Sequence, residues 1–310
     1  MKTYMNRRQF LNNSATTLAA LTAARYLPAL AAEADLEIGR HIYKSLKWDM
    51  VKAPGNTLDK FKLLRELGYD GVELDSPGGL DKAEAIDASR KTGLRVDGIV
   101  DSKHWTVRHS DPDPAVRAQA LANLKTALRE AKMVGGDSVL LVPGKVTDSA
   151  KENHDQVWER SIPEIRKALP VAEEVGIKIL IENVGNGFCA TPELMAKYID
   201  EINHPLVGAH FDIGNHIPVS PPAHWIRVLG KRVKKLDVKD RSIKDRKGMP
   251  IGEGDAGWAD IRQALTEIGY RGWAAAEVNG GDRPQLADIL ERMNRVLGKS
   301  DGKPDLVKAG

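Results

Sequence analysis

Strand-like and helix-like segments alternate from residue 36 to the end of this 310-residue chain. Eight such repeats can be counted from the spacing of apolar residues and of turn residues. The strands are expected near residues 37–43, 70–76, 95–101, 137–143, 177–184, 206–213, 233–240 and 273–279, and the helices near 57–68, 80–92, 113–134, 154–175, 191–202, 221–230, 258–268 and 284–297. Eight strand-helix units in roughly 250 residues predict an α/β fold, a (β/α)8 TIM barrel, in preference to an open doubly wound sheet.

The boundaries of the expected helices carry capping residues. Asp113-Pro114 and Thr191-Pro192 are typical of helix starts, and Gly68 and Gly176 follow two helix ends. No linker or low-complexity segment interrupts the repeats. We therefore assign residues 33–300 to a single barrel domain and residues 301–310 to a flexible tail.

The first 32 residues have the pattern of an export signal. The pair Arg7-Arg8 precedes a mildly apolar run of Ala, Leu and Thr, and the small residues Ala31 and Ala32 suit cleavage by signal peptidase. The run is shorter than the ~20 residues that a membrane span needs, and it contains Arg25, so a membrane anchor is disfavoured. We expect residues 1–32 to be a twin-arginine-type signal peptide that directs the mature protein to the periplasm.

Removal of this leader changes the charge balance. The whole chain has 46 basic and 43 acidic residues, a net charge of +3, and four of the basic residues but none of the acidic ones lie in residues 1–32. The mature chain is thus close to neutral, and its charge predicts neither a nucleic-acid partner nor an anionic membrane surface. The lone Cys189 excludes an internal disulfide. A homo-oligomer is compatible with these features.

The segment KRVKKLDVKDRS, residues 231–242, carries charged residues at alternating positions of an expected strand. Strand residues in a TIM barrel alternate between the interior and the surrounding helices, and functional groups gather at the carboxyl ends of the strands. If Leu236 and Val238 pack under the helices, Lys235, Asp237 and Lys239 point inward, the last two near the carboxyl end.

The same alternation applies to three neighbouring strands. It turns inward Glu182 in IKILIENV, Asp212 in VGAHFDIGN and Glu277 in WAAAEVNGG. Together with Asp237, four consecutive strands deliver a carboxylate to one end of the barrel. Ionised carboxylates at close range repel each other by roughly several kcal/mol, so they need a cation, protons or lysines among them. A hard divalent ion, Mn²⁺ or Mg²⁺, suits such oxygen ligands best.

The alternative is that these acids form internal salt bridges with Lys239, Lys235 and Lys178. The position of the four acids at the carboxyl end of the barrel favours a binding site. For Asp237 the two interpretations, a metal ligand and a partner of Lys239, stay open.

Four motifs together resemble one known family. IENV, FDIGN, LDVKD followed by IGEGDAGW, and AAEVNG are similar to the xylose isomerase-like TIM barrels, specifically the sugar phosphate isomerase/epimerase group, over about residues 37–297. Members hold one divalent metal ion through Glu, Asp, His and Glu. The resemblance implies that Glu182, Asp212, the Asp237 position and Glu277 are the metal ligands here.

The chain departs from the family pattern in two places. Asp237 stands where the strand-seven motif has His, ahead of Lys239 and Asp240. Many relatives have Asp-x-Gly-His after strand six, whereas this chain has Asp212-Ile-Gly-Asn215 and then His216. A site built only from carboxylates is harder and more anionic, which favours Mn²⁺, Mg²⁺ or even Ca²⁺ over Zn²⁺.

The resemblance also implies a reaction. In this family two metal-bound Glu residues exchange a proton at a carbon beside a carbonyl group, and here these are Glu182 and Glu277, one as base and one as acid. A nearby cation lowers the barrier to such a step because it stabilises the developing negative charge.

His104 and Trp105 follow the third strand in DSKHW. They suit a proton donor and a stacking plane for a sugar, although a hydrogen-bonded loop His beside a packed Trp is an equally good interpretation.

Further candidates for contact with substrate lie at the carboxyl ends of other strands. Roles other than substrate contact are also open for four of them. Glu73 could form a salt bridge, Lys239 could neutralise the acids near it, and His216 and Glu253 could lie in surface loops. The full set is Glu73, Lys239, His216, Trp105, Asn215 and Glu253.

Three functions are compatible with these residues. The first is a metal-dependent isomerase or epimerase of a non-phosphorylated keto-sugar, since export and the lack of a clear Arg/Lys cluster disfavour a sugar phosphate. The second is a 3-keto-glycoside lyase or hydratase that uses the same proton abstraction. The third is a sugar-binding protein with a degenerate metal site. The partner in each case is a small sugar or glycoside.

Overall fold

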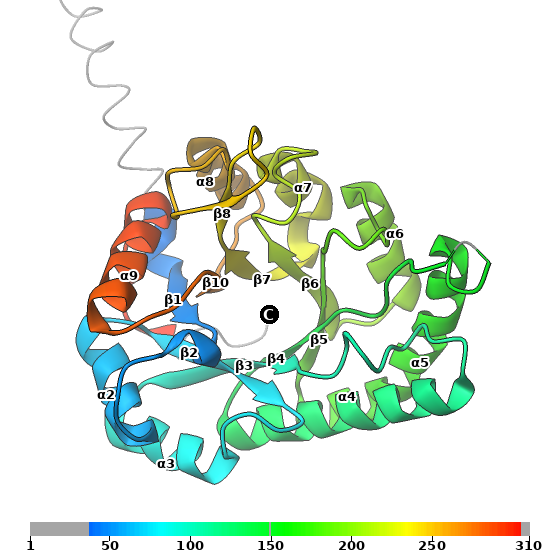
Figure 1. Ribbon diagram of the computed structural model, residues 1–310, viewed down its shortest axis with the longest axis horizontal. Coiled ribbons are helices and arrows are strands. Elements are labelled where there is room, and N and C mark those ends of the chain that lie inside the picture. The colour runs from blue at the N-terminus through cyan, green and yellow to red at the C-terminus, as the bar shows by residue number, and fades with distance from the viewer. Residues whose placement is uncertain (1–36, 149, 305–310) are drawn as a thin grey trace, which may run out of the picture.

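Eight parallel strands form a barrel that is surrounded by helices (Figure 1). The computed structural model describes residues 37–148 and 150–304. The strands pair in the order β1-β10-β7-β6-β5-β4-β3-β2. They are β1 Ile42–Leu46, β2 Gly71–Ser76, β3 Arg95–Asp101, β4 Ser138–Leu141, β5 Lys178–Glu182, β6 Val207–Asp212, β7 Val233–Val238 and β10 Gly272–Ala276. The predicted TIM barrel is confirmed.

The helices lie between successive barrel strands, on the outer side of the barrel (Figure 1). They are α2 Thr57–Leu67, α3 Lys82–Thr92, α4 Pro114–Val134, α5 His154–Val175, α6 Pro192–Ile202, α7 Pro222–Leu229, α8 Trp258–Glu267 and α9 Arg283–Leu297. Short 3₁₀ helices and a small hairpin complete the described chain: η1 Ile38–His41, η2 Trp48–Met50, η3 Gly230–Arg232, and the antiparallel pair β8 Asp240–Arg241 and β9 Gly248–Met249.

Side chains at the helix termini explain why the helices begin where they do. Asn56 accepts a hydrogen bond from the backbone N–H of Asp59, whose carboxylate returns the contact, and Asn153 and Gln156 form the same reciprocal pair. Such capping boxes satisfy N–H groups that have no partner within the helix. Gly176 ends α5 with a positive φ of 68°, a conformation that glycine adopts without steric cost.

The first strand lies further along the chain than the sequence predicted. Residues 38–41 of the expected strand 37–43 form η1, and the strand itself is β1, Ile42–Leu46. Gly39 packs directly against the backbone of Leu297 and Gly298, so no larger residue fits there and the chain turns before the strand begins. The predicted strand was therefore placed about four residues too early. Because β1 ends at Leu46, Lys47 directly follows the strand.

β1 and β2 meet where the barrel closes. The backbone N–H of Lys44 donates to the Asp70 carboxylate over 2.8 Å, and Lys47 and Glu73 form a parallel bridge. Since β1 also pairs with the last strand, β10, the barrel is closed and the carboxyl ends of all eight strands surround one opening.

Alternation along the strands separates two kinds of side chain. Leu236 and Val238 are fully buried in the main apolar core between strands and helices. Lys235 and Asp237, which alternate with them along β7, are buried inside the barrel. A second, smaller apolar cluster is formed by Leu140, Val142 and Val184 of the β4 and β5 region, with Val100 packed against it. The barrel interior therefore combines charged side chains, such as Asp237 and Lys235, with one apolar cluster beside β3 to β5.

Within the part of the chain that the structure describes, none of the helices combines the length and the apolar character of a transmembrane helix. The predicted signal peptide, residues 1–32, lies outside the described residues, as does most of the predicted tail.

Candidate active site

Four carboxylates meet at the carboxyl end of the barrel. Glu182 of β5, Asp212 of β6, Asp237 of β7 and Glu277, just after β10, each place one oxygen within 4.8 Å of the others. We call these residues the upper acid layer. Asp212 and Asp237 are completely buried, Glu182 is buried, and the Glu277 side chain is 37% exposed. The structure thus brings together the four acids that strand alternation selected, and their role as metal ligands stays a prediction.

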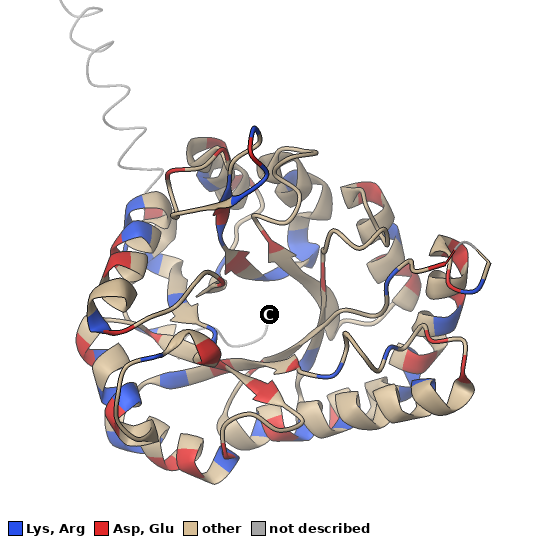
Figure 2. Cartoon of the chain, in the orientation of Figure 1, with Lys and Arg blue, Asp and Glu red and all other residues tan. Residues whose placement is uncertain are grey.

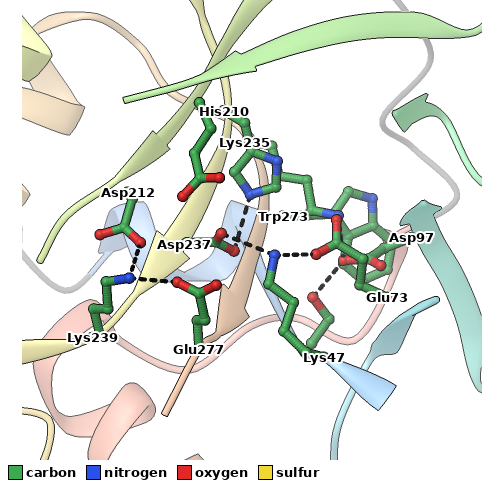
Figure 3. Close-up of polar contacts among 12 residues, drawn as sticks. Lys47, Glu73, Asp97, His210, Asp212, Lys235, Asp237, Lys239, Trp273 and Glu277 are labelled. Atoms are coloured by element: carbon green, nitrogen blue, oxygen red, sulfur yellow. Dashed lines mark hydrogen bonds and ion pairs between the residues drawn. The ribbon is translucent and has the colours of Figure 1, made fainter. Parts of the chain in front are cut away.

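Lys239 joins two members of the upper acid layer (Figure 3). Its Nζ lies 2.7 Å from Asp212 Oδ2 and 2.5 Å from Glu277 Oε2. Burial opposes the charge of this ammonium group, but the two carboxylates outweigh it and raise the pKa of Lys239 above its ordinary value. Lys239 is therefore a resident cation of the site.

Asp237 has other partners than Lys239, so the interpretation that pairs these two residues is wrong. Lys47 Nζ lies 2.9 Å from Asp237 Oδ2, and His210 Nε2 lies 3.0 Å from Asp237 Oδ1. Burial on its own raises the pKa of a carboxyl group, but His210 and Lys47 together bring the pKa of Asp237 below its ordinary value. Asp237 is the best compensated of the four upper acids.

A second group of acids lies nearer the amino ends of the strands, and we call Glu73 and Asp97 the lower acid layer. Lys235 Nζ lies 2.5 Å from Glu73 Oε1 and 3.0 Å from Asp97 Oδ2, and Lys47 Nζ lies 2.5 Å from Glu73 Oε2. Ser45 donates a further hydrogen bond to Asp97. Burial opposes ionisation of Glu73, but Lys235 and Lys47 outweigh it and lower its pKa to about 2. Lys235 thus forms salt bridges, but with these two acids and, among the described residues, with none of the four upper acids for which the salt-bridge interpretation proposed it.

Lys178, the third lysine of the salt-bridge interpretation, lies elsewhere. Its Nζ contacts Asp137 over 3.4 Å, at the amino end of β5.

The upper acid layer contains an unusual concentration of negative charge. Burial, followed by the charges of Glu277 and Asp237, raises the pKa of Glu182 well above its ordinary value. Burial also raises the pKa of Asp212 well above its usual range, against the opposing effect of Lys239. Among the described residues Glu182 forms no ion pair, so it is the acid with the least compensation. A group in this state calls for a proton or an added cation.

Sequence reasoning missed Lys47 and assigned no contact to His210. Lys47 was missed because the first strand was placed too early, and the correct strand end would have marked it as a residue at the opening. His210 was expected to lie in the core one position below Asp212, and it is indeed fully buried there, but its contact with Asp237 crosses from β6 to β7.

The FDIGN segment has a local structural reason. Asp212 Oδ1 accepts hydrogen bonds from the backbone N–H groups of Gly214 and Asn215, over 2.7 and 2.8 Å. Asn183 pairs with the backbone of Asp212 in both directions, and the Asn215 side chain donates to Glu182 Oε1 over 3.2 Å. These bonds fix Asp212 and orient Glu182, and they place Asn215 at the cavity wall.

His104 and Trp105 lie together at the opening. His104 is 2% exposed, accepts a hydrogen bond at Nδ1 from the Val142 N–H over 3.3 Å, and stands edge-on to Trp105 with ring centroids 5.1 Å apart. Burial and the charge of Lys47 lower the pKa of His104 to about 3, so the ring is neutral and its Nε2 carries the proton. Trp105 is 47% exposed and available for stacking.

Three predicted substrate contacts have different surroundings. Glu73 is buried in the lower acid layer and lines neither of the two cavities at the opening. His216 is buried against Trp225, with ring centroids 4.5 Å apart, so the surface position considered for it is wrong. Glu253 is half exposed and contacts Arg292 over 2.5 Å. Their predicted contacts with a substrate stay untested.

Two cavities open at the carboxyl end of the barrel and meet at the upper acid layer. The larger measures about 790 Å³ and the smaller about 540 Å³. Both are lined by five of the same residues, namely Lys47, Asp49, Lys239, Arg241 and Glu277. Figure 2 shows charged residues around the opening that the strands enclose.

Comparison with known proteins places the chain in a family. A family model described as xylose isomerase-like TIM barrel matches residues 61–296. The chain belongs to the xylose isomerase-like TIM barrel family. Among its relatives is the L-ribulose-5-phosphate 3-epimerase UlaE of Escherichia coli, which is 24% identical over 227 residues, 69% of this chain and 79% of that protein.

Solved structures of proteins named as epimerases or epimerase-like share this fold. A D-tagatose 3-epimerase-like protein matches with a TM-score of 0.70 and 19% identity over 83% of this chain and 98% of the other. The 3-keto-D-glucoside 4-epimerase YcjR from Escherichia coli matches with a TM-score of 0.70 and 17% identity over 82% and 98% of the two chains. These likenesses concern the fold.

The upper acid layer of this xylose isomerase-like barrel suits a hard divalent cation. It offers oxygen donors from four elements within 4.8 Å of one another, and its negative charge is only partly balanced by Lys239 and Lys47. Glu182 has no ion pair to give up, whereas the other three acids contact basic groups. A bound cation would therefore compete with Lys239 for Asp212 and Glu277.

Proposed function

We propose that the protein is a metal-dependent epimerase or isomerase that acts on a non-phosphorylated keto-sugar by proton transfer at a carbon next to the carbonyl group. The observation that carries this proposal is the position of Glu182 and Glu277, two carboxyl groups on opposite sides of one acid cluster beside a cavity. Relatives named as sugar epimerases support the same class of reaction.

The surroundings of the two Glu residues assign their roles. Glu277 contacts the Lys239 ammonium group and lines both cavities, so we assign it the role of base. Without a bound ion, burial and acidic neighbours raise the pKa of Glu182, so this carboxylate takes up a proton more readily than an exposed Glu does, and we assign it the role of acid. Removal of a proton by one and return by the other on the opposite side inverts a carbon centre.

Other residues position the sugar in this proposal. Lys47 lines both cavities and is held between Glu73 and Asp237, so its ammonium group is fixed where a substrate oxygen is expected. His104 donates from Nε2, and Trp105 offers a face for a sugar ring.

A divalent ion held by Glu182, Asp212, Asp237 and Glu277 would polarise the substrate carbonyl and stabilise negative charge on its oxygen atoms. We propose Mn²⁺ or Mg²⁺, because all four ligands are carboxylates.

A free sugar is favoured over a sugar phosphate by the state of the basic residues. Of the four Lys and Arg residues that line the cavities, Lys47, Lys239 and Arg292 each contact two carboxylates already. The fourth, Arg241, donates to the backbone oxygen of Arg246. A phosphate group would compete with those acids for the same cations.

Export to the periplasm by the twin-arginine pathway is part of this proposal. It rests on the Arg7-Arg8 leader alone. Replacement of both arginines with Lys should leave the precursor in the cytoplasm, and the mass of the exported form should correspond to cleavage after Ala31 or Ala32. Equal export of the Lys variant would contradict the assignment.

Solvent exchange tests the reaction directly. We expect the protein with Mn²⁺ in D₂O to introduce deuterium next to the carbonyl of keto-sugars, measured by NMR. Glu277→Gln should lower the exchange rate by about 10²- to 10⁴-fold while the fold is kept, because the base is lost. Glu267→Gln, an exposed Glu paired with Arg227, is the matched control and should exchange at the wild-type rate.

The same measurement separates the alternatives. Exchange accompanied by loss of the group on the next carbon indicates a lyase, and binding without exchange indicates a sugar-binding protein. Retained exchange in Glu277→Gln would remove Glu277 from the role of base.

A further inference from the structure

The two cavities at the opening differ in what surrounds them. The smaller lies over β2 to β6 and includes His104, Trp105, Glu182 and Asn215 in its lining. The larger extends from the same acid cluster toward the β8–β9 hairpin and α9. Pockets for small molecules measure roughly 300 to 1,000 Å³, so each cavity is large enough to hold a ligand group of its own.

The residues of the proposed reaction lie at the junction. Glu277, Lys239 and Lys47 line both cavities, while Glu182 and the two aromatic rings of His104 and Trp105 line the smaller one. A keto-sugar ring that reaches both Glu182 and Glu277 therefore occupies the smaller cavity and the junction. It leaves the larger cavity empty unless the sugar carries a further group.

The larger cavity is held in shape by specific contacts. Asp240 accepts hydrogen bonds from the Trp258 indole N–H over 2.8 Å and from the Gly252 backbone N–H over 3.0 Å, which fixes the chain after the hairpin. Arg292 of α9 contacts Glu253 and Asp288 over 2.5 and 2.6 Å. The pair with Glu253 ties the chain after the hairpin to α9, and the pair with Asp288 lies within α9. The larger cavity is thus formed before any ligand binds, as ligand pockets usually are.

Its lining combines apolar and hydrogen-bonding groups. Met50, Ile251 and Ile289 provide buried apolar surface, and Asn279 and Gln285 provide amides. Apolar surface with a few amides suits the faces and hydroxyl groups of a sugar ring, or a hydrophobic aglycone with polar substituents. Arg292 contacts two acids already, whereas Arg241 of the same lining donates to a backbone oxygen.

We propose that the larger cavity binds the group attached through the glycosidic oxygen, so that the substrate class is a keto-glycoside and not a free keto-monosaccharide. This inference rests on the proposed function for the chemistry at the junction, but the second binding position is a property of the larger cavity itself. The keto ring lies in the smaller cavity, and the aglycone or second sugar lies between the β8–β9 hairpin and α9.

Gln285→Trp tests this assignment, because Gln285 is an exposed residue of α9 whose side chain lines the larger cavity only. A Trp there adds bulk to the α9 side of the larger cavity, at a position that does not line the smaller one. Glu291→Trp, at an exposed position of the same helix outside both linings, is the matched control. Exchange would be compared for 3-keto-glucose and for the 3-keto derivative of cellobiose, a two-ring glycoside.

We expect the wild type to prefer the two-ring substrate in kcat/KM by about 10- to 100-fold, the range that one added group in a pocket provides. Gln285→Trp should lose this preference and keep the rate with 3-keto-glucose, and Glu291→Trp should change neither. Equal kcat/KM values for the two substrates in the wild type, or a preference that survives in Gln285→Trp, would overturn the inference.

A binding measurement keeps the test independent of catalysis. In saturation-transfer NMR with unoxidised cellobiose, both rings should receive saturation from the wild type and one ring should lose it in Gln285→Trp. Saturation of one ring only in the wild type would overturn the inference. Absence of exchange with every keto-sugar, together with contact to both rings, would reject the proposed function and retain the second binding position.

Discussion

The two acid layers of the barrel interior differ in how their charge is compensated. In the lower acid layer, Lys235 contacts both Glu73 and Asp97, and Lys47 contacts Glu73 as well. In the upper acid layer, two lysines and His210 are shared among four carboxylates, and Glu182 has no ion pair among the described residues. The lower layer therefore stabilises the barrel by itself, whereas the upper layer is suited to bind something else.

The comparison also explains why Asp237 replaces the expected His. Asp237 is held by His210 and by Lys47, so this carboxylate belongs to the upper layer by position and resembles the lower layer in its compensation. The sequence has an Asp on β7 and a His on β6, and the two side chains meet across the strand pair. An imidazole and a carboxylate are thus both present at this strand pair, the imidazole on β6 and the carboxylate on β7.

Lys235→Met should give the largest loss of stability. It removes the cation between Glu73 and Asp97 and leaves buried carboxylates without their partner, which costs about 3–5 kcal/mol. Urea unfolding of the variant and the wild type would measure the difference. Lys91→Met, which breaks an exposed pair with Asp87, should cost less than about 1 kcal/mol. Similar losses in both variants would mean that the lower layer is not a stabilising ion network.

Glu182→Gln should have the opposite effect on the stability of the metal-free protein. Without metal the variant should be at least as stable as the wild type, because a buried acid without an ion pair is neutralised while its hydrogen bond from Asn215 is kept. At a Mn²⁺ concentration about 100 times the dissociation constant, the wild type should gain about 2.7 kcal/mol and the variant much less. Thermal unfolding with EDTA and with Mn²⁺ measures both effects.

Glu73→Gln is the control from the other layer. It should lower stability and retain the gain from Mn²⁺, because Glu73 pairs with Lys235 and Lys47 and is not one of the four upper acids, although it shares Lys47 with Asp237 and has an oxygen within 4.8 Å of that residue. A Mn²⁺ gain that is lost in Glu73→Gln and kept in Glu182→Gln would reverse the assignment of the two layers.

The sequence predicted the four acids of the upper layer far better than the basic residues that balance their charge. Strand alternation is a local property, so Glu182, Asp212, Asp237 and Glu277 were selected from four short segments without knowledge of the fold. Their partners depend on contacts between distant segments. Lys47 and Asp237 are separated by 190 positions, and they meet because the first and seventh strands flank β10 in the closed barrel.

Errors in strand boundaries and the unknown paths of loops limited the prediction of the other site residues. The error of about four residues at β1 removed Lys47 from view, since it placed this residue in a loop and not at a strand end. Glu253 was selected for its Gly-rich surroundings, but its contact with Arg292 of α9 follows from how a long loop folds over the barrel, which no local pattern specifies.

The pH dependence of stability should separate the layers further. A carboxyl group whose pKa is raised on folding contributes stability that is complete below its ordinary pKa, 4.5 for Glu182, and that is lost as the pH rises through the raised value. With EDTA, the wild type should therefore lose stability above pH 4.5 relative to Glu182→Gln, by up to about 1.4 kcal/mol per pH unit for one proton.

Glu73 acts in the other direction and in another pH range. Its pKa is lowered to about 2, so its contribution is present above its ordinary value of 4.5 and is lost as the pH falls below that value. Comparison of Glu73→Gln with the wild type in urea at pH 3 to 5 should show this loss. Parallel pH profiles for the two Gln variants would mean that the layers do not differ in ionisation.

Lys239→Met should have the smallest effect, and its direction is the informative part. The Lys239 ammonium group contacts the same oxygens, Asp212 Oδ2 and Glu277 Oε2, that a divalent ion would use, so its removal should tighten Mn²⁺ binding by up to about tenfold. Lys239→Arg keeps the charge and should bind Mn²⁺ like the wild type or more weakly. Calorimetric titration measures all three. Weaker binding in Lys239→Met would mean that the lysine holds Asp212 and Glu277 in place for the ion, and that the positive charge at this position assists the cation site more than it competes with it.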